Sequence, residues 1–176
     1  MAARKRGLRI YLAGPLGFSE AGRVFHNDHV VPALKMLGHE VLDPFALTDA
    51  RKVARVARMP FGAKRRDAWA KLNVEIGGRN RRAIDESDMV FAILDGVDVD
   101  SGTAAEIGYA FARGKPVLGY RGDFRLSADN EGSTVNLQVE YFIRESGGTI
   151  ITRLSDAGRA IKLLASFGRK RHRPHL

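Results

Sequence analysis

Cysteine is absent from this chain of 176 residues. Without thiol groups the protein can form no disulfide framework, no zinc cluster held by thiolates and no cysteine nucleophile. Long apolar runs are absent as well, because the run that begins at residue 8 meets polar and turn residues too soon to span a membrane. Since the sequence also shows no signal peptide, we expect a cytoplasmic protein with no membrane partner.

Aromatic residues are scarce where the positive charge is concentrated. The net charge is +9, and three segments without any acidic residue supply fourteen of the 29 Lys and Arg, at 4–6, 51–66 and 169–173. Elsewhere fifteen basic residues face twenty acidic ones, so the body of the protein is mildly acidic. Nucleic-acid modules interleave aromatic with basic side chains, whereas Phe61 is the only aromatic residue in these segments. We therefore expect solvated basic segments and no specific nucleic-acid partner.

Apolar runs alternate with segments of helical periodicity along the chain. The runs predict five strands, at 8–13, 39–42, 89–94, 116–120 and 149–152. The periodicity predicts helices at 19–37, 67–86, 103–113, 136–145 and 155–167. Pro32 is expected to kink or split the first helix. Residues 46–66 are predicted to be a loop with a helical turn, of the kind that serves as a lid or substrate loop.

This alternation predicts a single α/β domain over residues 8–167, flanked by basic tails at 1–7 and 168–176. The run at 89–94 is unbroken and apolar, as a central strand covered on both faces requires. The expected architecture is an open parallel five-stranded sheet with helices on both faces. Ligands bind beyond the carboxyl ends of such strands, which places function in four segments, 14–18, 43–66, 95–106 and 121–136.

Four acidic residues lie between Asp95 and Glu106, directly after the central strand. A calcium loop of this length would need oxygen ligands at its third and fifth positions and glycine at its sixth. The chain has Val97, Val99 and Asp100 there. We therefore expect no metal site.

Glu106 has two interpretations. With Thr103 it forms the pattern of a capping box, in which both side chains satisfy amides at the start of a helix. Alternatively it is a nucleophile, since the helix dipole favours an ionised carboxylate in the first turn. The cap accounts for Thr103 and Glu106 but not for the neighbouring Asp98, Asp100 and Gly102.

Phosphate-binding motifs are missing. The loop after the first strand lacks the G-x-G-x-x-G spacing, and no Walker lysine pattern occurs in the chain. We expect no cofactor. Tyr11, inside that first strand, is equally compatible with a packed aromatic residue and with a site residue.

Several motifs, taken together, resemble the nucleoside 2-deoxyribosyltransferase family. They are IYLAGPLGF from Ile10, N-x3-I-x3-D from Asn80 to Asp88, FAILDG, DSGTAAEIGYAFARGKPV from Asp100 to Val117, and VNLQVEYF from Val135 to Phe142. The D-S-G-T-x-x-E-x-G-Y-A segment is the most specific of these. The resemblance covers residues 8–152 and implies a flavodoxin-like fold and transfer of 2-deoxyribose between purine or pyrimidine bases by double displacement, a reaction of nucleotide salvage.

The resemblance also implies roles for individual residues. Glu106 matches the nucleophile that attacks C1′ and forms a covalent glycosyl-enzyme, Asp100 a carboxylate that helps to protonate the departing base, and Tyr11 a tyrosine that orients the nucleophile. Asn136 matches a residue that a neighbouring subunit contributes, so a homo-oligomer is implied. The substrate-binding residues are then Gly14, Pro15, Phe18, Asn80, Gly102, Asn136 and Gln138.

Asn80 departs from the pattern, because some members carry an aspartate there that protonates the base. Two routes for the proton are then open, from Asp100 alone or through water. Two carboxyl groups about 5 Å apart favour a retaining path through a cationic transition state. The short spacing from Asp100 to Glu106 is compatible with that separation.

Two other functions remain open at this point. An N-hydrolase of nucleoside 5′-monophosphates on the same scaffold would bind phosphate near the first loop, where Ser19 and Arg23 lie. A non-catalytic nucleotide sensor of the same fold is the third alternative. An exchange assay with a deoxynucleoside and a second base separates the three.

Overall fold

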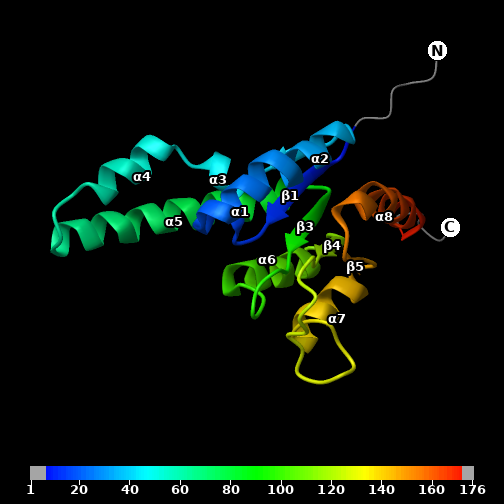
Figure 1. The fold of residues 1–176 in the computed structure, drawn as a ribbon. Coiled ribbons are helices and arrows are strands. Elements are labelled where there is room, and N and C mark those ends of the chain that lie inside the picture. The colour runs from blue at the N-terminus through cyan, green and yellow to red at the C-terminus, as the bar shows by residue number, and fades with distance from the viewer. Residues whose placement is uncertain (1–6, 172–176) are drawn as a thin grey trace, which may run out of the picture.

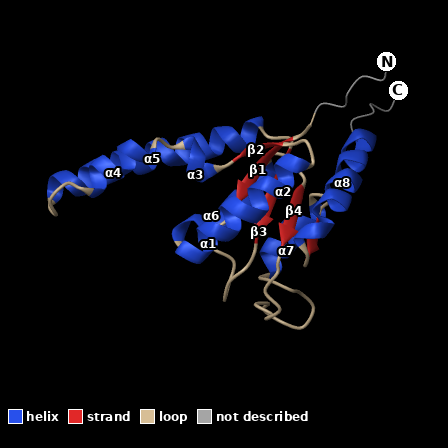
Figure 2. Cartoon of the chain, turned by 45° about the horizontal axis from the view of Figure 1, so that its top comes forward, coloured by secondary structure: helices blue, strands red, loops and turns tan. Residues whose placement is uncertain are grey.

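Five apolar segments form one parallel β-sheet in the spatial order β2-β1-β3-β4-β5. The strands are β1 (Arg9–Ala13), β2 (Glu40–Leu42), β3 (Met89–Ile93), β4 (Val117–Tyr120) and β5 (Thr149–Ile151). The structure, a computed structural model, describes residues 7–171 (Figure 1). It confirms the predicted α/β class, a flavodoxin-like open sheet with helices on both faces (Figure 2).

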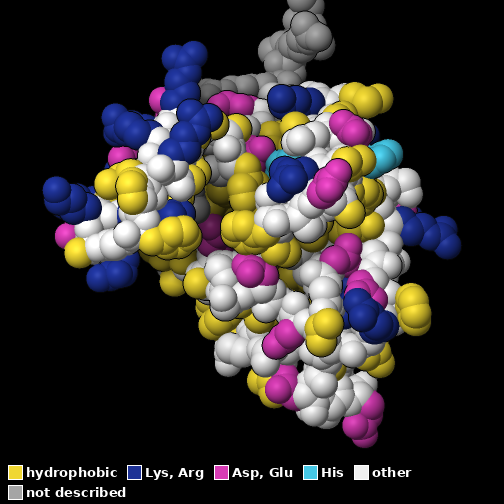
Figure 3. Space-filling model, turned by 60° about the vertical axis from the view of Figure 1, so that its left-hand side comes forward, with side chains coloured by type: hydrophobic (Ala, Val, Ile, Leu, Met, Phe, Trp, Pro, Cys, Tyr) yellow, Lys and Arg dark blue, Asp and Glu magenta, His cyan; other side chains and the backbone are white. Residues whose placement is uncertain are grey.

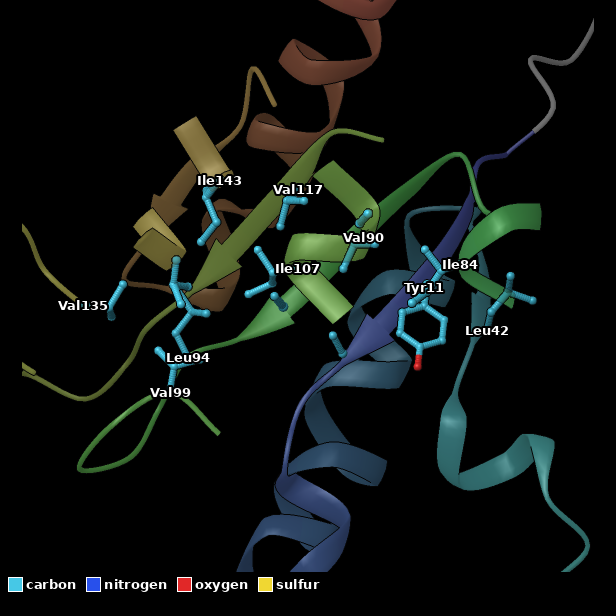
Figure 4. Packing of buried hydrophobic residues seen from close by; sticks show 14 of the residues in the cluster. Tyr11, Leu42, Ile84, Val90, Leu94, Val99, Ile107, Val117, Val135 and Ile143 are labelled. Carbon is cyan, nitrogen blue, oxygen red and sulfur yellow. The ribbon is translucent and has the colours of Figure 1, made fainter. Parts of the chain in front are cut away.

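Successive residues of each strand face opposite layers of helices. On one side Tyr11 and Val90 pack with buried residues of α5 (Ala63–Glu86), α6 (Ser101–Ala112) and α7 (Leu137–Glu145), as Figure 4 shows. On the other side Ile10, Leu12 and Phe91 pack with α2 (Val31–Met36) and α8 (Ala157–Arg171). All five residues of β3 are buried, which confirms its central place.

The helix predicted at 19–37 is divided near Pro32, as expected. α1 (Glu20–Phe25) leads into a π-helical turn at His26–Val30, which is followed by α2 with Pro32 in its first turn. Proline lacks the N–H that a regular helical ladder uses, and a wider π turn accommodates this loss. Gly38, at φ 85°, follows the helix and begins the turn into β2.

Most of the segment predicted as a loop at 46–66 is helical, so that prediction was wrong. α3 (Pro44–Leu47) and α4 (Ala50–Ala57) occupy much of it, and α5 begins at Ala63 rather than at residue 67. The side chains of Asp43 and Asp49 cap α3 and α4. Few apolar residues mark a helical periodicity in this segment, so the hydrophobic pattern was weak. Alanine and arginine nevertheless favour helix through their intrinsic propensity.

α4 and α5 pack together as a helical hairpin that projects from one edge of the sheet (Figures 1 and 2). We refer to residues 50–82 as the arm. Its inner end lies beside α3 and the start of α6, whereas the turn between its two helices is remote from the strands. The arm places most of the basic 51–66 segment away from the body of the molecule.

The basic tails expected at 1–7 and 168–176 lie outside the described residues, apart from Gly7 and the backbone of the last turn of α8. Residues 122–134 form an irregular loop. Within residues 7–171, no helix is both long and apolar enough to cross a membrane.

Candidate active site

A cavity of about 730 Å³ opens beyond the carboxyl ends of β1, β2 and β3, between the body and the arm. This is where open parallel sheets bind ligands. Its lining comes from the first loop and α1 (Gly14, Gly17, Phe18, Arg23), from the segment α3 to α5 (Pro44, Phe45, Thr48, Ala50, Val53, Ala54, Ile76, Asn80) and from the start of α6 (Asp100, Gly102, Thr103, Glu106).

Glu106 is held by one of its two carboxylate oxygens. The Tyr11 hydroxyl donates a hydrogen bond to Glu106 Oε1 at 2.6 Å, and Asn80 Nδ2 donates to the same atom at 3.5 Å. No hydrogen bond of residues 7–171 uses Oε2. Tyr11 comes from β1, Asn80 from α5 and Glu106 from α6, so three distant segments fix this carboxylate.

The environment of Glu106 disfavours its charged form. Burial raises the pKa of Glu106 above its ordinary range, and the nearby charge of Asp100 raises it further, against the hydrogen bonds from Tyr11 and Asn80. Burial and the charge of Glu106 also raise the pKa of the Tyr11 phenol. Tyr11 therefore stays protonated and remains a hydrogen-bond donor.

The helix α6 is capped by Asp100 and not by Thr103. Asp100 Oδ2 accepts from the Thr103 amide at 3.0 Å and from the Thr103 hydroxyl at 3.2 Å. Glu106 consequently lies in the second turn and has no capping contact, so the capping-box interpretation was wrong. We had expected the helix terminus to favour the ionised form of this carboxylate and so to lower its pKa. The pKa of Glu106 is raised instead.

Four of the predicted substrate-binding residues line the cavity, namely Gly14, Phe18, Asn80 and Gly102. A side chain at Gly14 would come within 2.8 Å of Ile93, so the backbone approaches the sheet closely there. Pro15 is not part of the lining but immediately precedes the short 3-10 turn Leu16–Phe18 that presents the Phe18 ring.

Asn136 and Gln138 do not reach the cavity of their own chain. Asn136 is the N-cap of α7, and its side chain accepts from the amides of Gln138 at 3.1 Å and Val139 at 3.3 Å. Neither Asn136 nor Gln138 belongs to the cavity lining. The structure of one chain thus brings Tyr11, Asn80, Asp100 and Glu106 together and leaves these two residues apart.

The largely apolar wall opposite Glu106 was missed by the sequence analysis. It consists of side chains from α3 and α4, including Phe45, Val53 and Ala54. The Phe45 ring meets Phe18 edge to face with a centroid distance of 5.4 Å. Apolar residues spaced within the basic segment were the available signal, but the high charge of that segment obscured it.

A buried pair behind this wall was also missed. His26 Nε2 lies 2.8 Å from Asp43 Oδ2, and the other oxygen of Asp43 accepts from the amide of Phe45 at 3.0 Å. Only 4% of His26 is exposed. Because Asp43 joins His26 to the start of α3, the pair fixes the helix that carries Phe45.

Within residues 7–171, no three His, Asp or Glu side chains lie close enough together to hold a metal ion. The cavity is lined instead by the polar side chains of Arg23, Thr48, Asn80, Asp100, Thr103 and Glu106. The buried Tyr11 hydroxyl adjoins them through its hydrogen bond to Glu106. Together with an apolar wall, these groups suit a planar heterocycle joined to a sugar.

An open parallel α/β sheet with a carboxylate-bearing cavity at its carboxyl edge defines a class of ligand-binding and enzymatic folds. Within that class, the family model described as "Nucleoside 2-deoxyribosyltransferase" matches residues 10–138. The chain belongs to the nucleoside 2-deoxyribosyltransferase family.

Individual proteins are similar to this chain in sequence or in fold. An uncharacterized protein of Schizosaccharomyces pombe is 27% identical over an alignment 197 residues long. The alignment covers 82% of this chain and 93% of that protein. A conserved protein from Enterococcus faecalis is 24% identical with a TM-score of 0.61, over 89% of this chain and 98% of that one. The 2-deoxyribosyltransferase from Bacillus psychrosaccharolyticus is 22% identical with a TM-score of 0.58, over 85% and 90%.

Proposed function

We propose that the protein transfers 2-deoxyribose between nucleobases, with Glu106 as the nucleophile. The observation that carries this proposal is the half-buried Glu106 carboxylate, which Tyr11 anchors by one oxygen at the edge of a largely apolar cavity. Membership of the family supports the reaction class. The unbonded Oε2 is the atom that attacks C1′ of a bound deoxynucleoside.

In the first half-reaction, the Glu106 Oε2–C1′ bond forms and the glycosidic C1′–N bond breaks. The bonding electrons of the broken bond leave with the base, which takes up a proton as it departs. The transition state is cationic at the sugar, and a nearby carboxylate stabilises it electrostatically. The product of this half-reaction is a glycosyl ester on Glu106 and a free base.

In the second half-reaction, a ring nitrogen of another base attacks C1′ and displaces the Glu106 carboxylate. The incoming base loses its proton, so the cycle restores the enzyme and is balanced without a cofactor. Two displacements at the same carbon retain the configuration of the sugar. Exclusion of water by the apolar wall favours the base over hydrolysis.

Asp100 is the proposed proton donor to the base, directly or through a water molecule. It lines the cavity and already accepts two hydrogen bonds through Oδ2, which leaves its other oxygen to face the ligand. Asn80 donates toward Glu106 and has no acidic proton to give. It therefore positions the nucleophile rather than protonating the base.

Asn136 is proposed to complete the site of a neighbouring subunit. Its position at the N-cap of α7, outside the cavity of its own chain, is compatible with such a contribution. We accordingly propose that the enzyme works as a homo-oligomer on a deoxynucleoside and a free base.

The test of the nucleophile is an exchange assay with the purified protein, a deoxynucleoside and a second free base, followed by chromatography of the products. We expect the exchanged nucleoside from the wild type and none from Glu106→Gln, which keeps a hydrogen-bond acceptor for Tyr11 but cannot form the ester. Mass spectrometry after acid quenching should detect one deoxyribosyl group on the wild type only.

Glu145→Gln is the matched control, since Glu145 is exposed at the end of α7. It should exchange bases like the wild type. Exchange activity in Glu106→Gln would refute the assignment of the nucleophile. A glycosidic bond broken at the same rate with and without the second base would identify a hydrolase instead.

Hydrolysis of nucleoside 5′-monophosphates is the second candidate, because Arg23 lines the cavity at the first loop. The guanidinium makes one long contact, 3.4 Å to the Gly17 carbonyl, and could turn toward a 5′-phosphate. Activity restricted to monophosphates and lost in Arg23→Gln would select this candidate. Equal activity of Arg23→Gln and wild type on nucleosides would exclude it.

A further inference from the structure

The arm carries a net charge as large as that of the whole protein. Residues 50–82 contain eleven Lys and Arg against two acidic residues, Asp67 and Glu75, which leaves +9 on the arm. Figure 3 shows these basic side chains gathered on the lobe at the left, whereas acidic side chains are scattered over the rest of that face. The charge is therefore concentrated on a projecting element.

Most of these cations lack an acidic partner. Lys52 and Arg79 pair with Glu75, and Arg81 pairs with Asp85. The other eight form no ion pair within the described part of the chain, and they are Arg51, Arg55, Arg58, Lys64, Arg65, Arg66, Lys71 and Arg82. The charges of these eight side chains are therefore available to an external anion.

Helical spacing aligns three of the free cations. Arg51, Arg55 and Arg58 follow each other at intervals of four and three residues and are all exposed. Val53, on the other side of α4, lines the cavity. Like charges four residues apart repel each other on a helix, so an anionic chain along the stripe would relieve this repulsion.

A groove between α4 and α5 adds further basic groups beside the stripe. It has a volume of about 330 Å³, and Lys52, Arg55, Lys71 and Glu75 line it around an apolar floor that includes Val56 and Leu72. Glu75 pairs with Lys52, so Arg55 and Lys71 are the cations of the groove without an acidic partner in the described part of the chain.

The turn between the two helices presents an aromatic ring among these cations. Phe61 is 92% exposed, and the guanidinium carbon of Arg65 lies 4.1 Å from the centre of its ring. Bases of single-stranded nucleic acids stack on exposed aromatic rings and on arginine. Within the described residues, the Phe61 ring stacks on no other aromatic ring and packs into no core cluster.

We propose that the arm binds a single strand of nucleic acid without regard to its base sequence. The stripe of Arg51, Arg55 and Arg58 and the adjoining groove hold the phosphates, and Phe61 stacks on a base. A membrane surface fits less well, because such binding needs several large apolar side chains on one face. This binding does not depend on the deoxyribosyl transfer proposed for the cavity.

Fluorescence anisotropy with a labelled single-stranded oligodeoxythymidylate and the full-length protein tests the proposal. The variant R51Q/R55Q/R58Q should bind at least about tenfold more weakly at moderate salt, and the slope of log affinity against log salt should fall by about 2, since each contact with a single strand contributes roughly 0.7. Glutamine preserves helix propensity, and circular dichroism verifies the fold.

The matched control is R153Q/R159Q/K162Q, which removes the same charge from exposed positions near and within α8. We expect it to bind like the wild type, and both variants to retain base exchange. Equal weakening in the two variants would overturn the proposal in favour of net charge alone. Binding to phosphatidylserine vesicles without binding to the oligonucleotide would overturn it in favour of a membrane.

Phe61→Ser provides a second measurement that leaves the charge intact. We expect weaker binding of the oligonucleotide with an unchanged affinity for inorganic polyphosphate, which has no bases to stack. If Phe61→Ser binds the oligonucleotide as tightly as the wild type, the stacking contact does not exist and the proposed mode of binding is wrong.

Discussion

At the scale of single residues, the chemistry depends on how Glu106 keeps its charge inside the protein. Burial opposes ionisation, and the Tyr11 hydroxyl at 2.6 Å counteracts it. The pKa of Tyr11 is raised as well, by burial and by the charge of Glu106. Tyr11 therefore stays protonated and donates its hydrogen bond to Glu106.

The acid side of the pH–rate profile should report the raised pKa of Glu106. The nucleophile acts only when ionised, so kcat/KM should fall with decreasing pH at a value above the ordinary range of glutamate. Tyr11→Phe removes a hydrogen bond that favours the carboxylate, which raises this pKa further. We expect its acid limb at higher pH, with the largest loss of kcat/KM in acidic buffers.

Tyr109→Phe controls for the loss of a phenol. Tyr109 also donates to a carboxylate, Asp85, at 2.8 Å, but it lies farther along α6 and outside the cavity lining. The acid limb of this variant should coincide with that of the wild type. If Tyr11→Phe left the limb in place, Tyr11 would have no electrostatic role at Glu106.

At the scale of elements, α3 is a short helix whose position forms the cavity wall. Four residues cannot hold a helix by themselves, and the side chain of Asp43 supplies a cap together with the contact to His26. The cavity therefore depends on a polar pair that lies behind it.

Asp43→Ala should raise KM more than it changes kcat. The variant loses the cap and the partner of His26, so the Phe45 side of the cavity becomes less ordered while Glu106 keeps its contacts. The cap alone is worth about 1 kcal/mol of stability, which urea unfolding measures.

Asp43→Asn keeps an oxygen that accepts from the Phe45 amide and serves as the conservative control, since asparagine caps helices well. It should recover most of the stability and of the affinity for substrate. A KM of Asp43→Ala equal to that of the wild type would show that α3 does not position the wall.

At the scale of the whole molecule, the proposed oligomer leads to a complementation experiment. Asn136→Ser keeps a capping side chain at the start of α7 but lacks the amide that would reach the neighbouring site. Alone, this variant and Glu106→Gln should each be nearly inactive in exchange. When the two chains are co-expressed and purified together, mixed oligomers contain intact sites and activity should return.

Each variant co-expressed with a differently tagged copy of itself is the control and should stay inactive. If the mixed sample showed no activity although both tags purified together, Asn136 would act within its own chain or not at all. Size-exclusion chromatography with light scattering gives the number of subunits in the same samples.

The strands and the order of the motifs could be predicted from the sequence. A parallel strand buried on both faces reads as an unbroken apolar run, which is why 89–94 was recognised as central. Pro32 marked the division of the first helix for an equally local reason. Glu106 and Asp100 were selected by their motif and by their position after the central strand, and Tyr11 by its match to the family motif.

Other features could not be predicted because they depend on contacts between distant segments. Thr103 and Glu106 have the spacing of a capping box, yet Asp100 caps the helix and Glu106 turns toward Tyr11, 95 residues away. The helix α4 of the arm escaped prediction because its basic exposed face hides a narrow apolar one, whereas most of α5 was predicted.

The sequence by itself determined the α/β class, the central strand and the family, since these follow from local apolar patterns and from contiguous motifs. Only the tertiary structure decided which acid caps α6, what raises the pKa of Glu106 and where the basic segment lies. The physical reason is that burial and electrostatic environment are set by neighbours in space. Residues far apart in the chain supply those neighbours here.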